Sequence, residues 1–206
     1  MTQATIAWLN FAVLVFSSIA FSILYVLSVR PAHLEQKIGE KAYRRCGHYR
    51  MVAMVPMVVA SLNYVLYRWY PLPIDPLPAR FPRPYGINVT LATIIGIPAM
   101  ALMLWGVRDA GKEGLAPDKS HTMYGGIYEK IRHPQAVGEA PIWIVMALLI
   151  NSPFLAVFSL LYLGVWYWWC VEEEKDLLLR YGQAYAGYCA RTGMLWPKRQ
   201  RGSDVS

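Results

Sequence analysis

Long apolar segments separated by short polar ones dominate the chain. The segments that are apolar enough to be membrane helices are residues 6–29, 51–67, 87–107, 137–150 and 153–171. A helix rises about 1.5 Å per residue and a hydrocarbon core is about 30 Å thick, so the first and third are long enough to cross it. The fourth would span only about 21 Å. We therefore expect it to start within the membrane interface or to be extended by Gln135 and Ala136.

The fourth and fifth apolar segments are joined only by Asn151 and Ser152, which predicts a tight helical hairpin. Either of these residues can cap the second helix, and Pro153 suits the first helical turn. One polar cluster, residues 121–134, precedes the hairpin, and a second, residues 172–174, follows it. Because the chain crosses the membrane and returns, we expect the two clusters to lie close together on one side of the bilayer.

The remaining segments complete a single membrane domain over residues 1–206. Residues 1–107 hold three spans, residues 108–198 form the core with the polar clusters, and residues 199–206 are expected to be disordered. Residues 70–85 are rich in proline and should form an extended loop, because proline has no backbone N–H to donate. Charge and leucine alternate over residues 175–187, as they do in an amphipathic helix.

Composition supports the membrane assignment. The chain is 56% hydrophobic and only 16% charged, and its net charge is +7. Lysine and arginine gather in residues 30–50, residues 108–132 and the carboxyl-terminal tail, so the positive-inside rule places the amino terminus outside and the carboxyl terminus in the cytoplasm. In a prokaryote this would be the inner (plasma) membrane. No basic helix with interleaved aromatic residues is present, which excludes nucleic acid as a partner.

The cysteines do not point to a disulfide framework or to a metal site. The chain has three, Cys46, Cys170 and Cys189, which are scattered and lack metal-ligand spacing. We therefore expect no metal. An odd number of spans and the lack of an internal repeat also argue against a transporter built from inverted repeats.

The two polar clusters have a plain structural interpretation and a functional one. Arg132 can reach lipid headgroups, and glutamates at positions 172–174 can form a solvated helix end. Three adjacent carboxylates, however, repel one another and the anionic cytoplasmic face of a membrane. Together the clusters would suit a ligand site, since glutamate can accept hydrogen bonds from hydroxyl or ammonium groups and Arg132 and His133 can bind a carboxylate. A ligand with all these groups, and an adenine, is S-adenosylmethionine.

Short motifs follow one another in a fixed order around the hairpin. They are Gly126-Ile127-Tyr128, Arg132-His133-Pro134, Glu173-Glu174, and Tyr181-Gly182 with Tyr185 and Tyr188. In this order and spacing the chain resembles the membrane methyltransferase superfamily of isoprenylcysteine carboxyl methyltransferases, phospholipid methyltransferases and their prokaryotic relatives. The resemblance covers roughly residues 121–198 and implies an all-α integral membrane protein, of about five transmembrane helices with a cytoplasmic cofactor pocket at the carboxyl-terminal hairpin.

The resemblance also implies a set of residues that bind S-adenosylmethionine. They are His121, Thr122, Met123, Tyr124, Tyr128, His133, Pro134, Gln135, Ala136, Glu173 and Glu174. Two positions depart from the family pattern. Ala136 stands where the family often has tyrosine, and Trp169 stands where the isoprenylcysteine enzymes have an arginine that meets the substrate carboxylate. Trp169 is therefore the candidate substrate contact, and a prenylated-cysteine carboxylate is a less favoured substrate.

We expect the protein to transfer a methyl group from S-adenosylmethionine to an apolar or amphipathic acceptor, which is lipid-like or a thiol. Arg132 and Glu139 are the candidate catalytic residues, and Glu139 would serve as a base for a protonated acceptor. Two alternatives are an NADPH-dependent membrane reductase resembling the sterol reductases and a non-catalytic membrane accessory protein. The identity of the acceptor and the oligomeric state stay open.

Overall fold

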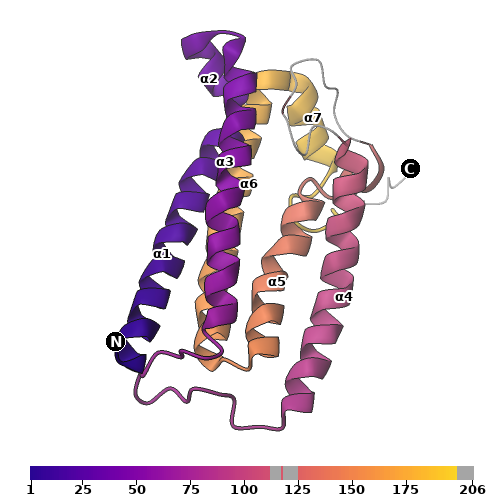
Figure 1. The fold of residues 1–206 in the computed structure, drawn as a ribbon. Coiled ribbons are helices and arrows are strands. Elements are labelled where there is room, and N and C mark those ends of the chain that lie inside the picture. Colours follow the sequence, from indigo (N-terminus) through magenta and orange to yellow (C-terminus); the bar gives the residue numbers. More distant parts are fainter. Residues whose placement is uncertain (112–116, 118–124, 199–206) are drawn as a thin grey trace, which may run out of the picture.

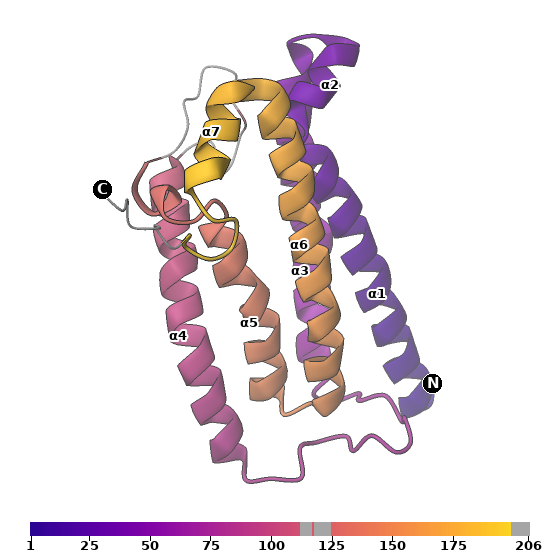
Figure 2. The ribbon, with the colours of Figure 1, turned by 180° about the vertical axis from the view of Figure 1, so that it is seen from behind.

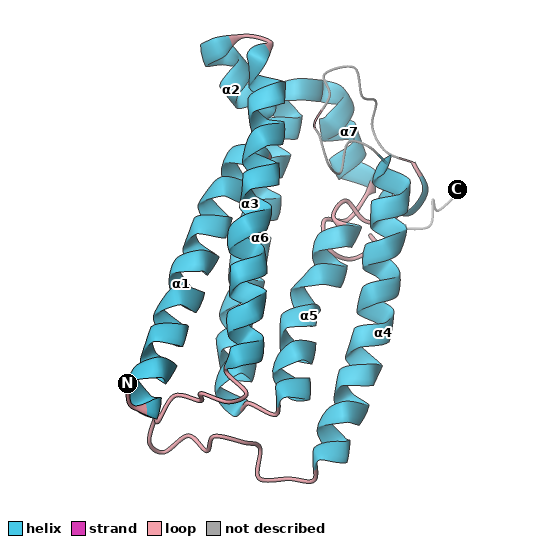
Figure 3. Cartoon of the chain, in the orientation of Figure 1, coloured by secondary structure: helices cyan, strands magenta, loops and turns pink. Residues whose placement is uncertain are grey.

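The computed structural model describes residues 1–111, 117 and 125–198, and all regular elements within them are helical (Figure 3). The α-helices are α1 (Gln3–Ser28), α2 (Pro31–Ile38), α3 (Lys41–Leu66), α4 (Tyr85–Ala110), α5 (Pro134–Ile150), α6 (Pro153–Tyr181) and α7 (Gln183–Arg191), with a short 3₁₀ helix, η2 (Gly126–Glu129). His121, Thr122, Met123 and Tyr124, which we expected to bind the cofactor, lie outside the described residues. So does the expected disordered tail at residues 199–206.

The long helices form one bundle. Within the described residues α1, α3, α4 and α6 are long and apolar enough to cross a membrane, and α5 is a shorter apolar helix of 17 residues. All five run along a common axis, with α2 and α7 at one end and the amino terminus at the other (Figures 1 and 2). The predicted all-α integral membrane class fits this arrangement. The count of five spans stays a prediction, because α5 is about 25 Å long at the standard helical rise.

Several helices extend beyond the apolar runs that predicted them. α3 begins at Lys41 rather than at residue 51, and α6 continues to Tyr181 rather than ending at residue 171. Hydropathy locates only the part of a helix that contacts lipid, and the polar turns outside the membrane carry no such signal. The amphipathic segment predicted over residues 175–187 is interrupted at Gly182, whose φ of 55° ends α6 and turns the chain into α7.

The hairpin forms as predicted. The Ser152 hydroxyl accepts a hydrogen bond from the Leu155 N–H at 3.2 Å, and Pro153 is the first residue of α6. Asn151 is in the left-handed conformation that ends α5. α5 starts at Pro134, so the expected extension of this helix through Gln135 and Ala136 is confirmed.

Aromatic rings fill the centre of the bundle. The Trp143 ring on α5 stacks on Tyr162 of α6 at 5.4 Å between centroids and meets Tyr64 of α3 at 4.9 Å. The Tyr64 hydroxyl in turn lies 3.0 Å from the hydroxyl of Ser159. These contacts join α6 to α3 and α5 in the middle of the bundle.

Close packing of α4 against α5 depends on Gly138. A Cβ atom at this position would lie 2.5 Å from both the Ala99 carbonyl oxygen and the Met103 nitrogen. We expect Gly138→Ala to destabilise the protein by about 1–3 kcal/mol, because backbone atoms cannot move aside as a flexible side chain can. Thermal unfolding of the detergent-purified protein, followed by circular dichroism, measures this. Gly164→Ala is the matched control, since nothing lies within 4 Å of its Cβ and it should unfold no earlier than the parent.

Candidate functional site

The hairpin brings the two predicted polar clusters into direct contact. The Arg132 guanidinium donates to both oxygens of Glu174, from Nε at 2.7 Å and from Nη2 at 3.2 Å. His133 lies between the neighbouring carboxylates, with Nε2 3.1 Å from Glu174 and Nδ1 3.5 Å from Glu173. Bidentate arginine–carboxylate pairs are among the strongest polar contacts in proteins. The start of α5 is therefore fixed to the polar part of α6.

The segment after α7 closes over the same corner. The Arg132 guanidinium also donates to the carbonyl oxygens of Thr192 and Cys189. The backbone N–H groups of Arg132 and His133 donate to the carbonyls of Gly193 and Met194 at 2.9 and 3.2 Å. Arg132 thus ties three segments together, and its side chain is used mainly to position its neighbours.

His133 is a buried cation at the centre of the site. Its side chain is 6% exposed. Burial alone would lower the pKa of His133, but hydrogen bonds with Cys170, Glu173 and Glu174 outweigh it and hold the pKa well above the usual value. His133 therefore carries a positive charge at neutral pH and balances the two glutamates beside it.

The third glutamate of the cluster has a different role. Glu172 pairs with Lys175 at 2.6 Å and with Arg30 at 3.6 Å, so it joins α6 to the start of α2. Asp176, one turn further along α6, accepts the N–H groups of Ala32 and His33 at 3.0 and 2.7 Å. Asp176 thus caps α2, and the ion pair between Glu172 and Arg30 holds the residue that precedes this helix.

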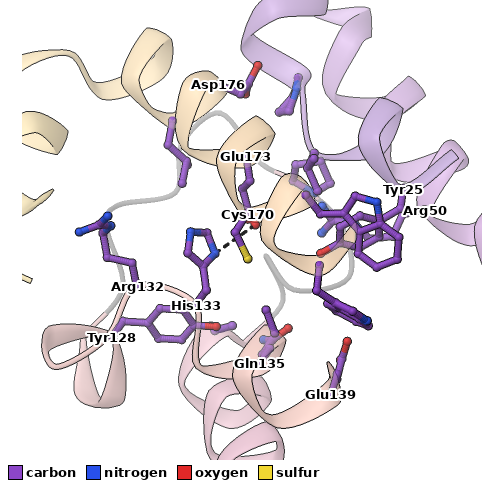
Figure 4. Close-up of a pocket in the computed structure, with 18 of the residues that line it drawn as sticks. Tyr25, Arg50, Tyr128, Arg132, His133, Gln135, Glu139, Cys170, Glu173 and Asp176 are labelled. Atoms are coloured by element: carbon purple, nitrogen blue, oxygen red, sulfur yellow. Dashed lines mark ion pairs between the residues drawn. The ribbon is translucent and has the colours of Figure 1, made fainter. Parts of the chain in front are cut away.

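A cavity of about 290 Å³ lies beside this cluster (Figure 4). The predicted site residues that line it are Tyr128, Arg132, His133, Gln135, Ala136, Glu139, Trp169 and Glu173. Two other predicted site residues that the structure describes, Pro134 and Glu174, do not line the cavity. Pro134 is buried at the first turn of α5, and the Glu174 carboxylate is bonded to Arg132 and His133. Of the paired glutamates, it is Glu173 that faces the open space.

Three residues that line the cavity carry a buried polar group without a hydrogen-bond partner among the described residues. The indole N–H groups of Trp166 and Trp169 and the hydroxyl of Tyr185 are buried without a hydrogen-bond partner among the described residues, and all three residues line the cavity. Buried donors are normally satisfied, so an unsatisfied group indicates a bound ligand or water. The oxygen and nitrogen acceptors of a nucleoside and of an amino-acid carboxylate match these donors, so the cavity residues fit S-adenosylmethionine.

Sequence reasoning missed part of this site. Tyr25 from α1, Arg50 from α3 and Tyr185 from α7 all line the cavity. Tyr185 belongs to the tyrosine motif of the tail, and that motif was a usable signal. Tyr25 and Arg50 lie far away in sequence and belong to no motif, so only the fold brings them to the cavity.

Comparison with protein families gives a match to the phospholipid methyltransferase family over residues 87–184, just under half of the chain. This region is therefore similar to the phospholipid methyltransferases. The match begins near the start of α4, earlier than the motifs that carried the resemblance, and it includes both arms of the hairpin. Comparison with curated proteins and with solved structures found no match.

The matched family is a methyltransferase family, and four described helices are long and apolar enough to cross a membrane. The matched region contains the clusters built around His133 and Glu173, whereas α1, α2 and α3 lie outside it. The cavity is bounded by both parts, since Tyr25 and Arg50 face it from the unmatched helices.

Proposed function

We propose that the protein is an S-adenosylmethionine-dependent methyltransferase that acts on an apolar or amphipathic acceptor at the membrane. One observation carries the proposal: in a region similar to the phospholipid methyltransferases, Glu173 and the His133 cation face one cavity together with buried donors that lack partners. This set can bind a molecule that carries an ammonium, a carboxylate, hydroxyls and an aromatic base.

S-adenosylmethionine, when bound, supplies a methyl group that is already activated on a sulfonium. The protein then has to align the acceptor with that methyl group and to exclude water, and such alignment contributes about 7–11 kcal/mol. Glu173 would accept hydrogen bonds from cofactor hydroxyl or ammonium groups, and Trp166, Trp169 and Tyr185 would donate to its acceptors. Tyr128 also lines the cavity, and its hydroxyl donates a hydrogen bond to the Gly106 carbonyl oxygen at 3.3 Å.

The expected topology places this cavity at the cytoplasmic end of the bundle, where S-adenosylmethionine is available. Among the described residues, the segment around α2 over residues 30–50, which is rich in lysine and arginine, lies at that end. The acceptor would enter from the bilayer. Arg132, a predicted catalytic residue, would serve the reaction by positioning, because its guanidinium holds Glu174 and the segment that follows α7.

Isothermal calorimetry on the detergent-purified protein tests the proposed function. S-adenosylhomocysteine, the expected product, should bind at micromolar concentration with a stoichiometry of about one, and NADPH should not bind. Binding of NADPH alone would instead support a membrane reductase, and binding of neither would support a non-catalytic accessory protein. The family match favours the methyltransferase over both.

A further inference from the structure

The first turns of α3 carry a row of exposed basic side chains. They are Lys41, Arg44, Arg45 and His48. Residues three or four positions apart share one face of an α-helix, so these four form one stripe, which we call the α3 basic face. The buried residues at the same level lie on the opposite side of the helix and are Ala42, Tyr43 and Cys46.

The α3 basic face continues along the helix into an apolar row. The next exposed residues in the same register are Met51, Val52, Val55, Val58 and Leu62, and each is more than half exposed. In a helix that is apolar enough to cross a membrane, such a row is covered by acyl chains. The positive-inside rule requires cations in the connector but does not set the side of the helix on which they lie. Here they lie on the side that faces lipid.

The position along the helix places these cations at the level of lipid headgroups. At the standard helical rise His48 is about 4.5 Å and Arg45 about 9 Å before Met51. The headgroup layer is about 5–8 Å thick on each side of a bilayer. The long side chains of arginine and lysine bridge such a difference in height, because their charged ends reach toward the polar layer.

One arginine of the α3 basic face is held in place by an aromatic neighbour. The Arg45 Nε donates to the Tyr49 hydroxyl at 2.9 Å, and the guanidinium carbon lies 5.8 Å from the centre of that ring. Tyr49 is one turn further along α3, so the Arg45 side chain is directed toward the membrane. Tyr49 takes only one of the five N–H donors of the guanidinium. Arg45 is therefore ordered before any ligand binds.

The acids of this region do not neutralise the α3 basic face. None of its members forms an ion pair with an acid that the structure describes. α3 itself contains no aspartate or glutamate. Over residues 30–50 six lysine and arginine residues stand against two glutamates, Glu35 and Glu40. The described part of the chain thus leaves a surplus of positive charge beside the apolar row.

We propose that the α3 basic face binds the headgroup of an anionic phospholipid in the cytoplasmic leaflet, with the acyl chains of this lipid along Met51, Val52 and Val55. The occupant is a lipid because the cations and the apolar row form one continuous surface. A phosphate accepts paired hydrogen bonds from guanidinium groups, whereas a zwitterionic headgroup would bring its own ammonium against the same cations. None of these residues lines the cavity, so the inference goes beyond the proposed methyl transfer and does not depend on it.

Native mass spectrometry of the full-length protein in detergent tests the proposal, with dioctanoyl phosphatidylglycerol and dioctanoyl phosphatidylcholine as the two probes. We expect about one site that prefers phosphatidylglycerol by roughly tenfold or more. Each lysine or arginine near an anionic surface contributes a factor of about five in affinity. Arg44→Gln with Arg45→Gln should therefore weaken the binding of phosphatidylglycerol roughly 25-fold and leave phosphatidylcholine unchanged.

Two exposed cations outside α3 supply the matched control. Lys130→Gln with Arg191→Gln removes the same charge from the protein but leaves the α3 basic face intact. Its affinity for phosphatidylglycerol should equal that of the parent. A loss of equal size in this variant would show that only the total charge of the protein matters.

Tyr49→Phe distinguishes a built site from diffuse attraction. The variant keeps every charge and the aromatic ring, but Arg45 loses the hydrogen bond that orders it. We expect the affinity for phosphatidylglycerol to fall about threefold, because the side chain then has to be ordered on binding. Diffuse attraction would not change. Arg44→Lys with Arg45→Lys keeps the test decisive if the glutamine variant does not fold, and it should prefer phosphatidylglycerol but bind it more weakly than the parent.

The other outcomes contradict the proposal in distinct ways. Equal affinities of the parent for the two lipids would overturn it and would favour an acidic protein as the occupant. Glycerol phosphate that binds as tightly as the lipid would show a site for free anions and would overturn the lipid assignment. The affinity for S-adenosylhomocysteine, measured separately by calorimetry, reports on the proposed function alone and should be the same in every variant of this face.

Discussion

Glu173→Gln is expected to weaken the binding of S-adenosylhomocysteine by roughly 10-fold to 100-fold. Glu173 is the member of the glutamate cluster that faces the cavity, and it lies 3.5 Å from the His133 cation. A hydrogen bond to a charged group contributes about 1.5–3 kcal/mol, and about 1.4 kcal/mol is a factor of ten in affinity. The amide keeps the size of the side chain but loses its charge. Calorimetry of the purified variant measures the change.

The adjacent glutamate supplies the control for this experiment. Glu172→Gln removes the same charge one position earlier, where the side chain pairs with Arg30 and Lys175 outside the cavity. Its affinity for S-adenosylhomocysteine should match that of the parent. If Glu173→Gln binds as tightly as the parent, or if only Glu172→Gln binds weakly, then Glu173 does not contact the cofactor.

Arg132→Ala is expected to cause the largest loss of stability of any substitution near the site. The change leaves the half-buried Glu174 carboxylate without its bidentate partner and removes the link to the Thr192 and Cys189 carbonyls. Breaking a buried ion pair by removing one partner costs about 3–5 kcal/mol. Thermal unfolding in detergent should show the loss. Limited proteolysis should also cut the segment after α7 faster than in the parent.

A double-mutant cycle separates the ion pair from the other contacts of Arg132. Glu174→Gln alone should be destabilising, and Arg132→Ala with Glu174→Gln should lose less stability than the two single losses added together. Arg132→Lys should not restore the parent, because an ammonium cannot bind both carboxylate oxygens in a fixed plane. Purely additive losses would show that the two side chains do not depend on each other.

Much of the hairpin was predictable from sequence because its signals are local. Ser152 and Pro153 mark a helix start wherever they follow an apolar run, and two apolar runs joined by a short turn must lie antiparallel. The meeting of Arg132 and His133 with Glu173 and Glu174 followed from this geometry alone. The family match over residues 87–184 covers the same hairpin.

Other features depended on contacts between distant segments, and the sequence carried no sign of them. The Asp176 carboxylate caps α2 through residues that lie 143 and 144 positions earlier in the sequence. The α2 segment itself has the composition of a polar connector, so no helix was predicted there. The family resemblance selected Glu173 and Glu174 over Glu172, but charge and periodicity alone did not, because which carboxylate faces the cavity depends on the rotation of α6 against α2 and α5. Arg50 reached the cavity for a similar reason, since the polar first turns of α3 extended its helix beyond the apolar run.

The pairing of Arg132 and His133 with Gly193 and Met194 has a consequence for biogenesis. Residues 193 and 194 leave the ribosome after every described helix of the bundle, so the corner that orients His133 and Glu173 cannot close before these helices have been synthesised. Nascent chains would hold their helices in the membrane before this corner is complete. A bulky fusion placed directly after Met194 would therefore delay closure of this corner and not the insertion of the helices.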